Sequence, residues 1–351
     1  MPGALPATIP DVAAAAGAST HDVALVVAAD PRVAPKLRHR ILEAIESCRY
    51  RPFEAVQAKL GRSLRIATIL KDYQQENPEQ NRFYHPVAGA IFRSCEAMAA
   101  EIVPSSMVAD DQCDLLELPP ELTSGNCDAA FIVGGQISAP MLERLAAVVP
   151  TVVLVDGYSD GSVLDSVVSD GVTGARAAVD HLVSVGHREI ALIGTEPTCF
   201  PSMLDRRRGY AEAIAAHRLP AHFVDTSYVL TSAVVVLGVA YLRTHSEVTA
   251  VLGANDVTAI SLMQAARDHG FRFPSDLSVV GFDDIDLAGL SMPALTTVAI
   301  DRTFMGRAGV ALMAHRLDVP DAEVLKAVVV PRLVERETVA PPRARQVGMP
   351  E

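Results

Sequence analysis

The stretch DGVTGARAAVDHLVSVGHREIALIG, residues 170–194, decides the fold class. Its first part has small and apolar residues at the spacing of an amphipathic helix over 175–185. A turn follows at Gly186, and residues 190–193 then form a short apolar run that fits a buried strand. A helix followed by a buried strand is the repeating unit of a parallel α/β sheet, so this pattern predicts βαβ architecture.

The same alternation continues on both sides of this stretch. Apolar runs that fit buried strands lie at 66–70, 129–133, 151–155, 250–252 and 277–280, and amphipathic helical segments lie at 87–100, 141–148, 207–216, 257–269 and 304–317. Because so many βα units exceed one comfortable sheet, we predict two stacked α/β lobes, each a doubly wound parallel sheet.

Residues 8–50 follow a different pattern, that of short helices in an all-α headpiece. The first helix stops at Gly17, Ser19 or Thr20 can cap the second, and Pro35 starts the third. Two short helices joined by a turn that contains glycine form a helix-turn-helix pattern.

Charge is distributed unevenly along the chain. The formal net charge is −12, whereas residues 1–62 taken alone carry +2 and the remainder carries −14. An acidic body repels DNA and leaves DNA contact to the mildly basic head. The N-terminus lacks the pattern of a signal peptide, and the apolar run at 233–240 is too short to span a bilayer. We therefore expect a cytoplasmic, nucleoid-associated protein without membrane contact.

Neither metal nor catalytic chemistry has a clear pattern in the sequence. The cysteines are odd in number and widely spaced, which favours reduced thiols without a bound metal: Cys48, Cys95, Cys113, Cys127 and Cys199. No nucleophile elbow, phosphate loop, HExxH or GxGxxG turn occurs, and His187 fits a turn between helix and strand better than a catalytic base. We expect no enzyme activity, no catalytic residues and no cofactor.

Several motifs, taken in order along nearly the whole chain, carry a family resemblance. They are TIPDVA (8–13), the stretch at 170–194, RRRGY (206–210), AND (254–256), VVGFDD (279–284), PALTTV (293–298) and PRLVERET (331–338). Together they resemble the LacI/GalR (lactose-repressor) family. The resemblance implies a transcription regulator, most often a repressor, that binds a near-palindromic operator as a homodimer and senses a small sugar-like effector. A tetramer and an activator stay open.

The resemblance also implies domain boundaries. The helix-turn-helix headpiece would span 1–52, the hinge 53–63, the effector-binding and dimerisation domain 64–340, and a tail 341–351. Its fold would be that of a type I periplasmic binding protein, with an N-lobe at about 64–164 and 295–325 and a C-lobe at about 165–294 and 326–340. The effector would lie in the interlobe cleft, and the chain would cross between lobes around 165, 294 and 325.

The implied DNA contacts come from the headpiece and the hinge. Thr20 and His21 would face base edges from the first turn of the recognition helix, and Thr8 and Ser19 would hold phosphates. Each has an ordinary alternative as a helix cap or a solvated side chain. In the hinge, Lys59 stands where the family has a leucine wedge for the minor groove, and Leu60 lies one position further on.

This chain departs from the family pattern in the recognition helix and the hinge. The family has Thr, Ser and Arg where the chain has Asp22, Ala24 and Leu25, and a hinge Leu where it has Lys59. An aspartate repels phosphates, and the lost arginine removes a contact from the place that Leu25 now takes. An alternative function is therefore a cytosolic sugar sensor with weakened or lost DNA binding.

The implied effector site is polar, with one apolar face. Arg206 can grip two neighbouring oxygens, Asn255 can donate and accept, and Asp283 is a carboxylate at a strand end. The remaining candidates are Asp156, Ser202 and the ring of Phe83 or Tyr84. The two aspartates have an alternative as turn caps, and Phe83 has one as a core residue.

Two further alternatives and one loop hypothesis complete the expectations. A transport-associated sugar-binding protein fits the body but not the headpiece, and an enzyme would turn its sugar over where a sensor leaves it unchanged. The polar segment 72–82 is either a tolerated surface loop or a lid that selects the effector. Pentoses, hexoses, nucleosides and sugar phosphates all stay open as effectors.

Overall fold

The computed structural model describes residues 6–28, 30, 32–72, 81–108, 115–159, 161, 163–226 and 231–342. These residues fall into two compact units. The first contains residues 6–72, Tyr84–Val168 and Asp301–Val329, and the second contains residues 81–83, Ser169–Ile300 and residues 330–342. The junctions after 168, 300 and 329 lie a few residues beyond the crossings that the resemblance implied.

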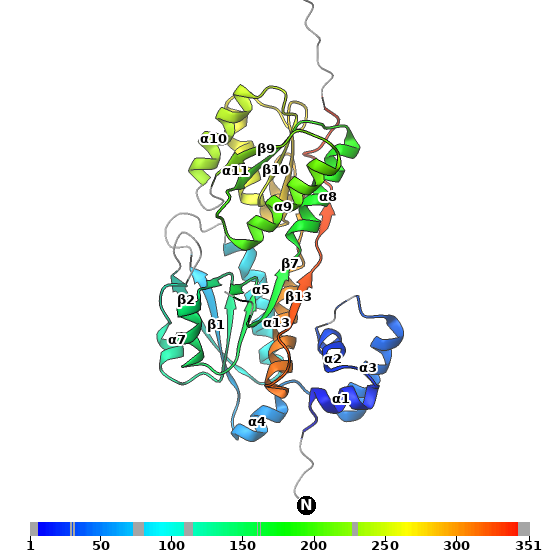
Figure 1. Cartoon of the computed structure of the whole chain (residues 1–351), viewed down its shortest axis with the longest axis vertical. Coiled ribbons are helices and arrows are strands. Elements are labelled where there is room, and N and C mark those ends of the chain that lie inside the picture. The colour runs from blue at the N-terminus through cyan, green and yellow to red at the C-terminus, as the bar shows by residue number, and fades with distance from the viewer. Residues whose placement is uncertain are drawn as a thin grey trace, which may run out of the picture. The chain divides into compact units, whose positions relative to one another are not determined.

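Four helices open the first unit. They are α1 (Ile9–Ala16), α2 (Thr20–Val27), α3 (Pro35–Cys48) and α4 (Glu54–Leu60), and the first three lie together in dark blue in Figure 1. Gly17 ends α1 in the left-handed conformation with φ of 58°, which costs glycine little. Val12, Val23, Val26 and Ile41 form the small apolar core of this headpiece.

A sheet organises the rest of the first unit. Within the described residues its strand order is β13-β7-β5-β3-β1-β2, and the pairs from β7 to β2 run parallel. The strands are β1 (Arg65–Asp72), β2 (Glu101–Val108), β3 (Ala129–Val133), β5 (Val152–Val155), β7 (Asp165–Ser169) and β13 (Lys326–Val329). The helices are α5 (Asn81–Ala97), α6 (Pro120–Thr123), α7 (Ala139–Ala146) and α13 (Arg302–Asp318), and a short pair joins β4 (Gln136–Ile137) to β6 (Tyr158–Ser159).

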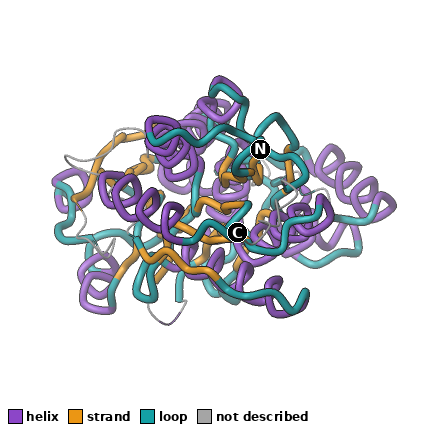
Figure 2. Tube along the Cα trace, turned by 90° about the horizontal axis from the view of Figure 1, so that it is seen from above, coloured by secondary structure: helices purple, strands orange, loops and turns teal. Residues whose placement is uncertain are grey.

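The second unit repeats this design. Its described strands have the order β14-β12-β11-β10-β8-β9, and all pairs are parallel except β12 with β14. The strands are β8 (Ile190–Thr195), β9 (His222–Asp225), β10 (Ala250–Gly253), β11 (Ser278–Asp283), β12 (Thr296–Ala299) and β14 (Arg332–Val334). The helices are α8 (Gly171–Val185), α9 (Pro201–Ala216), α10 (Thr231–Thr244), α11 (Asp256–Asp268) and α12 (Asp286–Leu290). Figure 2 shows strands flanked by helices, as the alternating pattern predicts.

Helices α8 and α9 approach so closely that glycine is required. A methyl group on Gly209 would overlap the carbonyl oxygen of Val172, and one on Gly174 would meet the ring of Phe282. Because Gly209 lies one turn after Arg206 on α9, this contact between the helices also fixes the position of Arg206.

The structure describes only part of the cysteines, the proposed lid and the tail. No helix in the described part of the chain is long and apolar enough to cross a membrane. Four cysteines are free thiols, Cys48, Cys95, Cys127 and Cys199, whereas Cys113 lies outside the described residues. Most of the proposed lid at 72–82 and of the tail at 341–351 also lies outside them.

Candidate functional site

Three predicted effector residues meet at one edge of the second sheet. Asp283 is the last residue of β11, Asn255 follows β10, and Arg206 comes from α9. The parallel strands of this sheet end at the same edge, where open α/β sheets bind ligands. The chain therefore concentrates polar groups at the place where the fold favours a ligand.

Arg206 is the centre of this cluster. Its side chain is only 4% exposed, and its Nη2 donates to Asp283 Oδ1 at 2.7 Å. Its Nη1 donates to the carbonyl oxygen of Ala254, and its guanidinium stacks 4.0 Å above the ring of Phe282. The buried Nε has no hydrogen-bond partner in the described part of the chain. The guanidinium is thus held by three contacts, and Nε is its one nitrogen without a partner among the described residues.

Asn255 and Asp283 have structural roles of their own. Asn255 caps α11, because its Oδ1 accepts from the N–H of Thr258 at 2.8 Å. Asp283 has a φ of 106° and the next residue, Asp284, a φ of 55°, both in the left-handed region that glycine favours. Backbone strain of this kind is held in place by surrounding contacts, here by Arg206 on Asp283. Asp283 thus combines a positive φ with a buried ion pair to Arg206.

Asp256 belongs to this cluster, although no role was predicted for it from the sequence. Its Oδ1 accepts from Thr297 Oγ1 at 2.5 Å, and its Oδ2 accepts from the N–H of Ile285 at 2.8 Å. Complete burial, reinforced by the nearby Asp283, raises its pKa well above the usual value. The one sequence indication was an aspartate that directly precedes the buried residues Val257 and Thr258 at the start of a helix.

Ser202 is buried but stands apart from this cluster. It lies in the first turn of α9, one turn before Arg206, and is 2% exposed. No hydrogen bond joins its hydroxyl to Arg206, Asn255 or Asp283 among the described contacts. Its role as an effector ligand stays a prediction.

The first unit has its own polar pair at the end of a strand. Asp156 follows β5 with a φ of 48° and is 4% exposed. Its Oδ2 accepts from the hydroxyl of Tyr84 at 3.0 Å, and the Tyr84 ring fills the space that a side chain on Gly134 would need. Phe83, beside Tyr84 in α5, is 7% exposed. Asp156 and Phe83 stay predictions as effector ligands.

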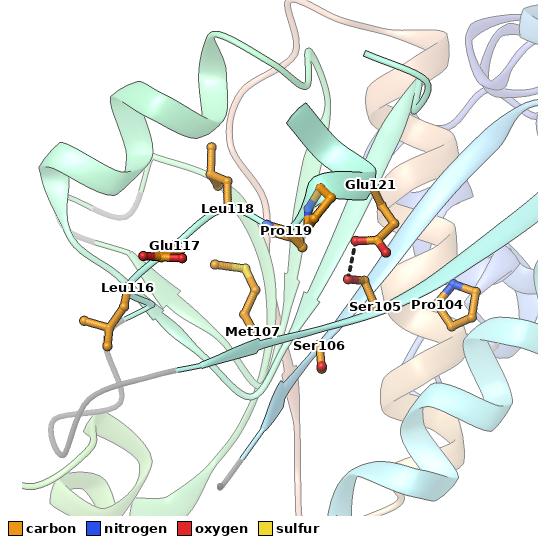
Figure 3. Close-up of a pocket in the computed structure, with 10 residues that line it drawn as sticks. Pro104, Ser105, Ser106, Met107, Leu116, Glu117, Leu118, Pro119 and Glu121 are labelled. Atoms are coloured by element: carbon orange, nitrogen blue, oxygen red, sulfur yellow. Dashed lines mark hydrogen bonds between the residues drawn. The ribbon is translucent and has the colours of Figure 1, made fainter. Parts of the chain in front are cut away.

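A surface groove in the first unit contains none of the predicted residues. It has a volume of about 720 Å³ and lies beside the edge strand β2, lined by residues 104–107 and 116–121 (Figure 3). Ser105 Oγ donates to Glu121 Oε2 at 2.8 Å and so ties β2 to α6. The groove is therefore separate from both polar clusters.

In the headpiece, the predicted phosphate contacts are helix caps. Thr8 Oγ1 donates to Asp11 at 2.7 Å at the start of α1. At the start of α2, Ser19 Oγ donates to Asp22 at 2.6 Å and accepts from the N–H of Asp22 at 3.0 Å. Asp22, whose charge we expected to face phosphates, is thus used in a capping box within its own helix.

The remaining DNA candidates differ in exposure. His21 is exposed and Thr20 half-buried in the first turn of α2, whereas Leu25 is half-buried further along it. Lys59 and Leu60 are both exposed at the end of α4, with 41% of Leu60 accessible. Residues 54–60 of the predicted hinge are therefore helical, and the last turn of this helix presents one cation and one apolar side chain.

His187, in the loop between α8 and β8, is held by structural contacts. Its ring is 1% exposed, with Nδ1 2.8 Å from Thr249 Oγ1 and Nε2 2.9 Å from the carbonyl oxygen of Ala340. Burial lowers its pKa below the ordinary 6.5, and a charge on His181 acts in the same direction. The hydrogen bond to Ala340 partly opposes this shift.

Acid is expected to weaken the second unit through His187. Since the folded pKa lies below 6.5, the unfolded chain takes up this proton first. Neutral His187 therefore contributes to the free energy of unfolding above pH 6.5, and this contribution is lost as the pH falls below that value. Urea unfolding between about pH 7 and pH 5 should show a larger fall in midpoint for the wild type than for His187→Gln. An equal fall in both proteins would contradict this role.

Comparison with known families decides the relationship. The family described as "Bacterial regulatory proteins, lacI family" matches residues 8–52, which cover α1 to α3. The chain belongs to the lacI family. A second description, "Periplasmic binding protein-like domain", matches residues 179–339 and includes Arg206, Asn255 and Asp283.

Similar proteins span this lacI-family chain almost completely. The Ribose operon repressor of Escherichia coli (strain K12) is 27% identical over 94% of this chain and 99% of its own length. Among solved structures, a lac repressor dimer bound to operator and the anti-inducer ONPF has a TM-score of 0.64 at 24% identity, over 95% of this chain and 99% of the other. A LacI family regulator from Enterococcus faecium with bound ribose has a TM-score of 0.67 at 22% identity, over 80% and 100%. These two structures support the fold, with a helix-turn-helix headpiece on a body like that of a periplasmic binding protein.

Proposed function

We propose that this lacI-family protein is a ligand-responsive repressor that binds a near-palindromic operator as a homodimer. It senses a sugar or sugar-like molecule at the carboxyl edge of the second sheet. The observation that carries the effector proposal is the buried guanidinium of Arg206, fixed by Asp283 and Ala254 with Nε left over. The unpartnered Nε, at the sheet edge where β10 and β11 end near Asn255 and Asp283, matches a ligand that offers a hydroxyl oxygen.

Support for DNA binding comes from the headpiece and from relatives. The matched headpiece has exposed His21 at the start of its second helix, and a hinge helix that ends in exposed Lys59 and Leu60. Curated relatives are repressors, including the Ribose operon repressor. A DNA-binding regulator needs no enzymatic step, and we infer that the protein acts in the cytoplasm on the nucleoid without catalysis.

A second candidate is a sugar sensor that has lost DNA binding. The observation that favours it is the apolar character of α2, where Ala24 and Leu25 offer DNA no hydrogen-bond donor. The two candidates differ in whether the full-length chain binds duplex DNA at low salt, since phosphate contacts alone give measurable binding.

DNA binding and its salt dependence test the proposed function. Fluorescence anisotropy of a duplex from the region upstream of the gene should show binding that weakens steeply between about 50 and 200 mM salt. His21→Ala should reduce preference for this duplex over a mixed sequence. Absence of binding by the wild type at the lowest salt would favour the second candidate.

Lys59→Ala is expected to lower the salt dependence in a defined way. Losing one phosphate contact should reduce the slope of log affinity against log salt by about one. Arg176→Ala is the matched control, because Arg176 is an exposed cation on α8 of the body, paired with Glu212. A change of slope in the control, or none in Lys59→Ala, would contradict the hinge contact.

Thermal unfolding with a series of sugars tests the effector. Pentoses, hexoses, nucleosides and sugar phosphates should be compared at concentrations far above ordinary affinities. A true ligand at 100 times its Kd stabilises the fold by about 2.7 kcal/mol, which is a clear shift in Tm. If no compound of these classes shifts the Tm, the effector belongs to another class.

A further inference from the structure

The face of α2 that begins at the exposed His21 is otherwise apolar, and its two alanines are buried. On a helix, His21, Ala24, Leu25 and Ala28 share one face, opposite Val23, which points into the headpiece core. Ala24 and Ala28 are only 2% and 4% exposed, yet neither belongs to that core. Something outside the headpiece core must therefore cover them.

The covering surface is a stripe on α13 of the body. Residues of this helix at helical spacing, Phe304, Ala308, Ala311 and Leu312, line a small cavity together with the face of α2. Leu325, Ala327 and Val328, from β13 and the residue before it, complete the lining. This cavity has a volume of only about 10 Å³, so the two surfaces are in close contact.

A polar contact holds one end of this surface, where α13 ends. Asp318, the last residue of α13, accepts a hydrogen bond from the N–H of Ile9 at 3.0 Å, at the start of α1. Lys59 of the hinge helix lies near the same carboxylate, since its charge acts on the pKa of Asp318. At α2, the buried His315 of α13 lies near His21, and a positive charge on His21 disfavours a charge on the His315 ring.

Open grooves border the contact on both sides. One of about 430 Å³ lies between α2, the start of α3 and β13, and another of about 380 Å³ lies beside Val27 and Ala311. The contact is formed mainly by alanine and leucine side chains and is bordered by these open grooves. Such a contact is reversible at modest cost.

We propose that this regulator is autoinhibited by its own body: the DNA-reading face of α2 docks on α13 and β13 and must undock before the headpiece enters a major groove. A recognition helix reads bases through the face that is covered here. Where the family pattern has Ser and Arg on this face, this chain has Ala24 and Leu25. These two apolar side chains are complementary to Ala308 and Leu312. The inference rests on the proposed DNA binding and adds a closed state to it.

A charged side chain at the centre of the contact should release the headpiece. Ala308→Arg places a long cation between α13 and α2 and leaves every DNA-contacting residue unchanged. Thr123→Arg is the matched control, since it adds the same charge at the exposed end of α6, away from the contact. The probe is a mixed-sequence duplex at low salt, which the headpiece binds through phosphates whatever the operator sequence.

The expected result is a gain in DNA affinity. If about nine-tenths of the wild type is docked, Ala308→Arg should bind the duplex about tenfold more tightly, and Thr123→Arg should bind like the wild type apart from its added charge. Hydroxyl-radical footprinting of the unmodified protein gives a second measurement. Saturating DNA should expose the side chains of Phe304 and Leu312, which lie on the body and not on the DNA-binding head.

The outcomes separate this inference from the function on which it rests. Autoinhibition is supported if Ala308→Arg binds the duplex more tightly than the wild type, or if Ala308→Arg binds it and the wild type does not. Equal affinity of wild type and folded Ala308→Arg, with no change at Phe304 and Leu312 when DNA is bound, overturns autoinhibition and leaves DNA binding intact. If no variant binds the duplex, the proposed DNA binding fails, and the closed state has nothing to inhibit.

Discussion

Arg206→Ala is expected to abolish sugar binding and to lower the stability of the second unit by about 3–5 kcal/mol, the usual consequence of removing one partner from a buried ion pair. The variant leaves the Asp283 carboxylate without its cation in a place where its side chain is only 10% exposed. It also removes the donor to Ala254 and the stacking on Phe282. Urea unfolding followed by far-UV circular dichroism measures the loss, because the chain has no tryptophan for fluorescence.

Arg208→Ala is the matched control for this prediction. Arg208 lies two residues further along α9, with its side chain 63% exposed, and pairs at the surface with Asp205 and Glu212. Exposed ion pairs contribute at most about 1 kcal/mol, so this variant should unfold nearly like the wild type and keep sugar binding. Similar stability losses in both variants would show that the Arg206 pair is not the buried support described here.

Asp256→Ala is expected to lower the free energy of unfolding by about 2–4 kcal/mol, because it leaves two buried donors unsatisfied and opens a cavity. The donors are the N–H of Ile285 and the hydroxyl of Thr297. Asp256→Asn should be tolerated far better, since burial already favours the neutral form of this carboxyl and an amide can replace it. Urea unfolding of the three proteins at one pH measures both differences.

The pH dependence gives this prediction a defined sign. The folded pKa of Asp256 lies well above the unfolded value of 3.8, so its contribution is fully present below pH 3.8 and is lost as the pH rises through the folded pKa. Asparagine does not titrate, and the stability of Asp256→Asn relative to the wild type should therefore increase with pH. A difference that is constant with pH would show that Asp256 is ionised in the fold.

The headpiece shows where sequence patterns succeed and where they stop. The glycine stop at Gly17 and the caps at Thr8 and Ser19 follow from local chemistry, and helix starts were predicted at these places. The sequence was interpreted for the charge of Asp22 near DNA, and the structure adds its contact with the Ser19 cap three residues earlier. The burial of Ala24 depends on α13, nearly 300 residues away along the chain, which no local pattern indicates.

The body gives a similar lesson. Buried strands such as β3 and β10 have continuous apolar runs and were predicted, whereas β2 was not. Strand β2 includes Pro104 and two serines, which a strand tolerates when it lies at the edge of its sheet. In the site, Arg206 and Asp283 could be expected together from motifs, but the carboxyl of Asp256 required knowledge of what surrounds it.

The most direct test of the regulator proposal is the dissociation constant for DNA, measured with and without the sugar found by screening. Two-site coupling predicts that this sugar changes the constant of the wild type by about 5- to 150-fold. Arg206→Lys keeps a cation beside Asp283 but loses the fork of donors, so its DNA affinity should no longer respond to the sugar. If a sugar that binds the wild type leaves its DNA affinity unchanged, the two sites are not coupled and the protein is not a ligand-responsive regulator.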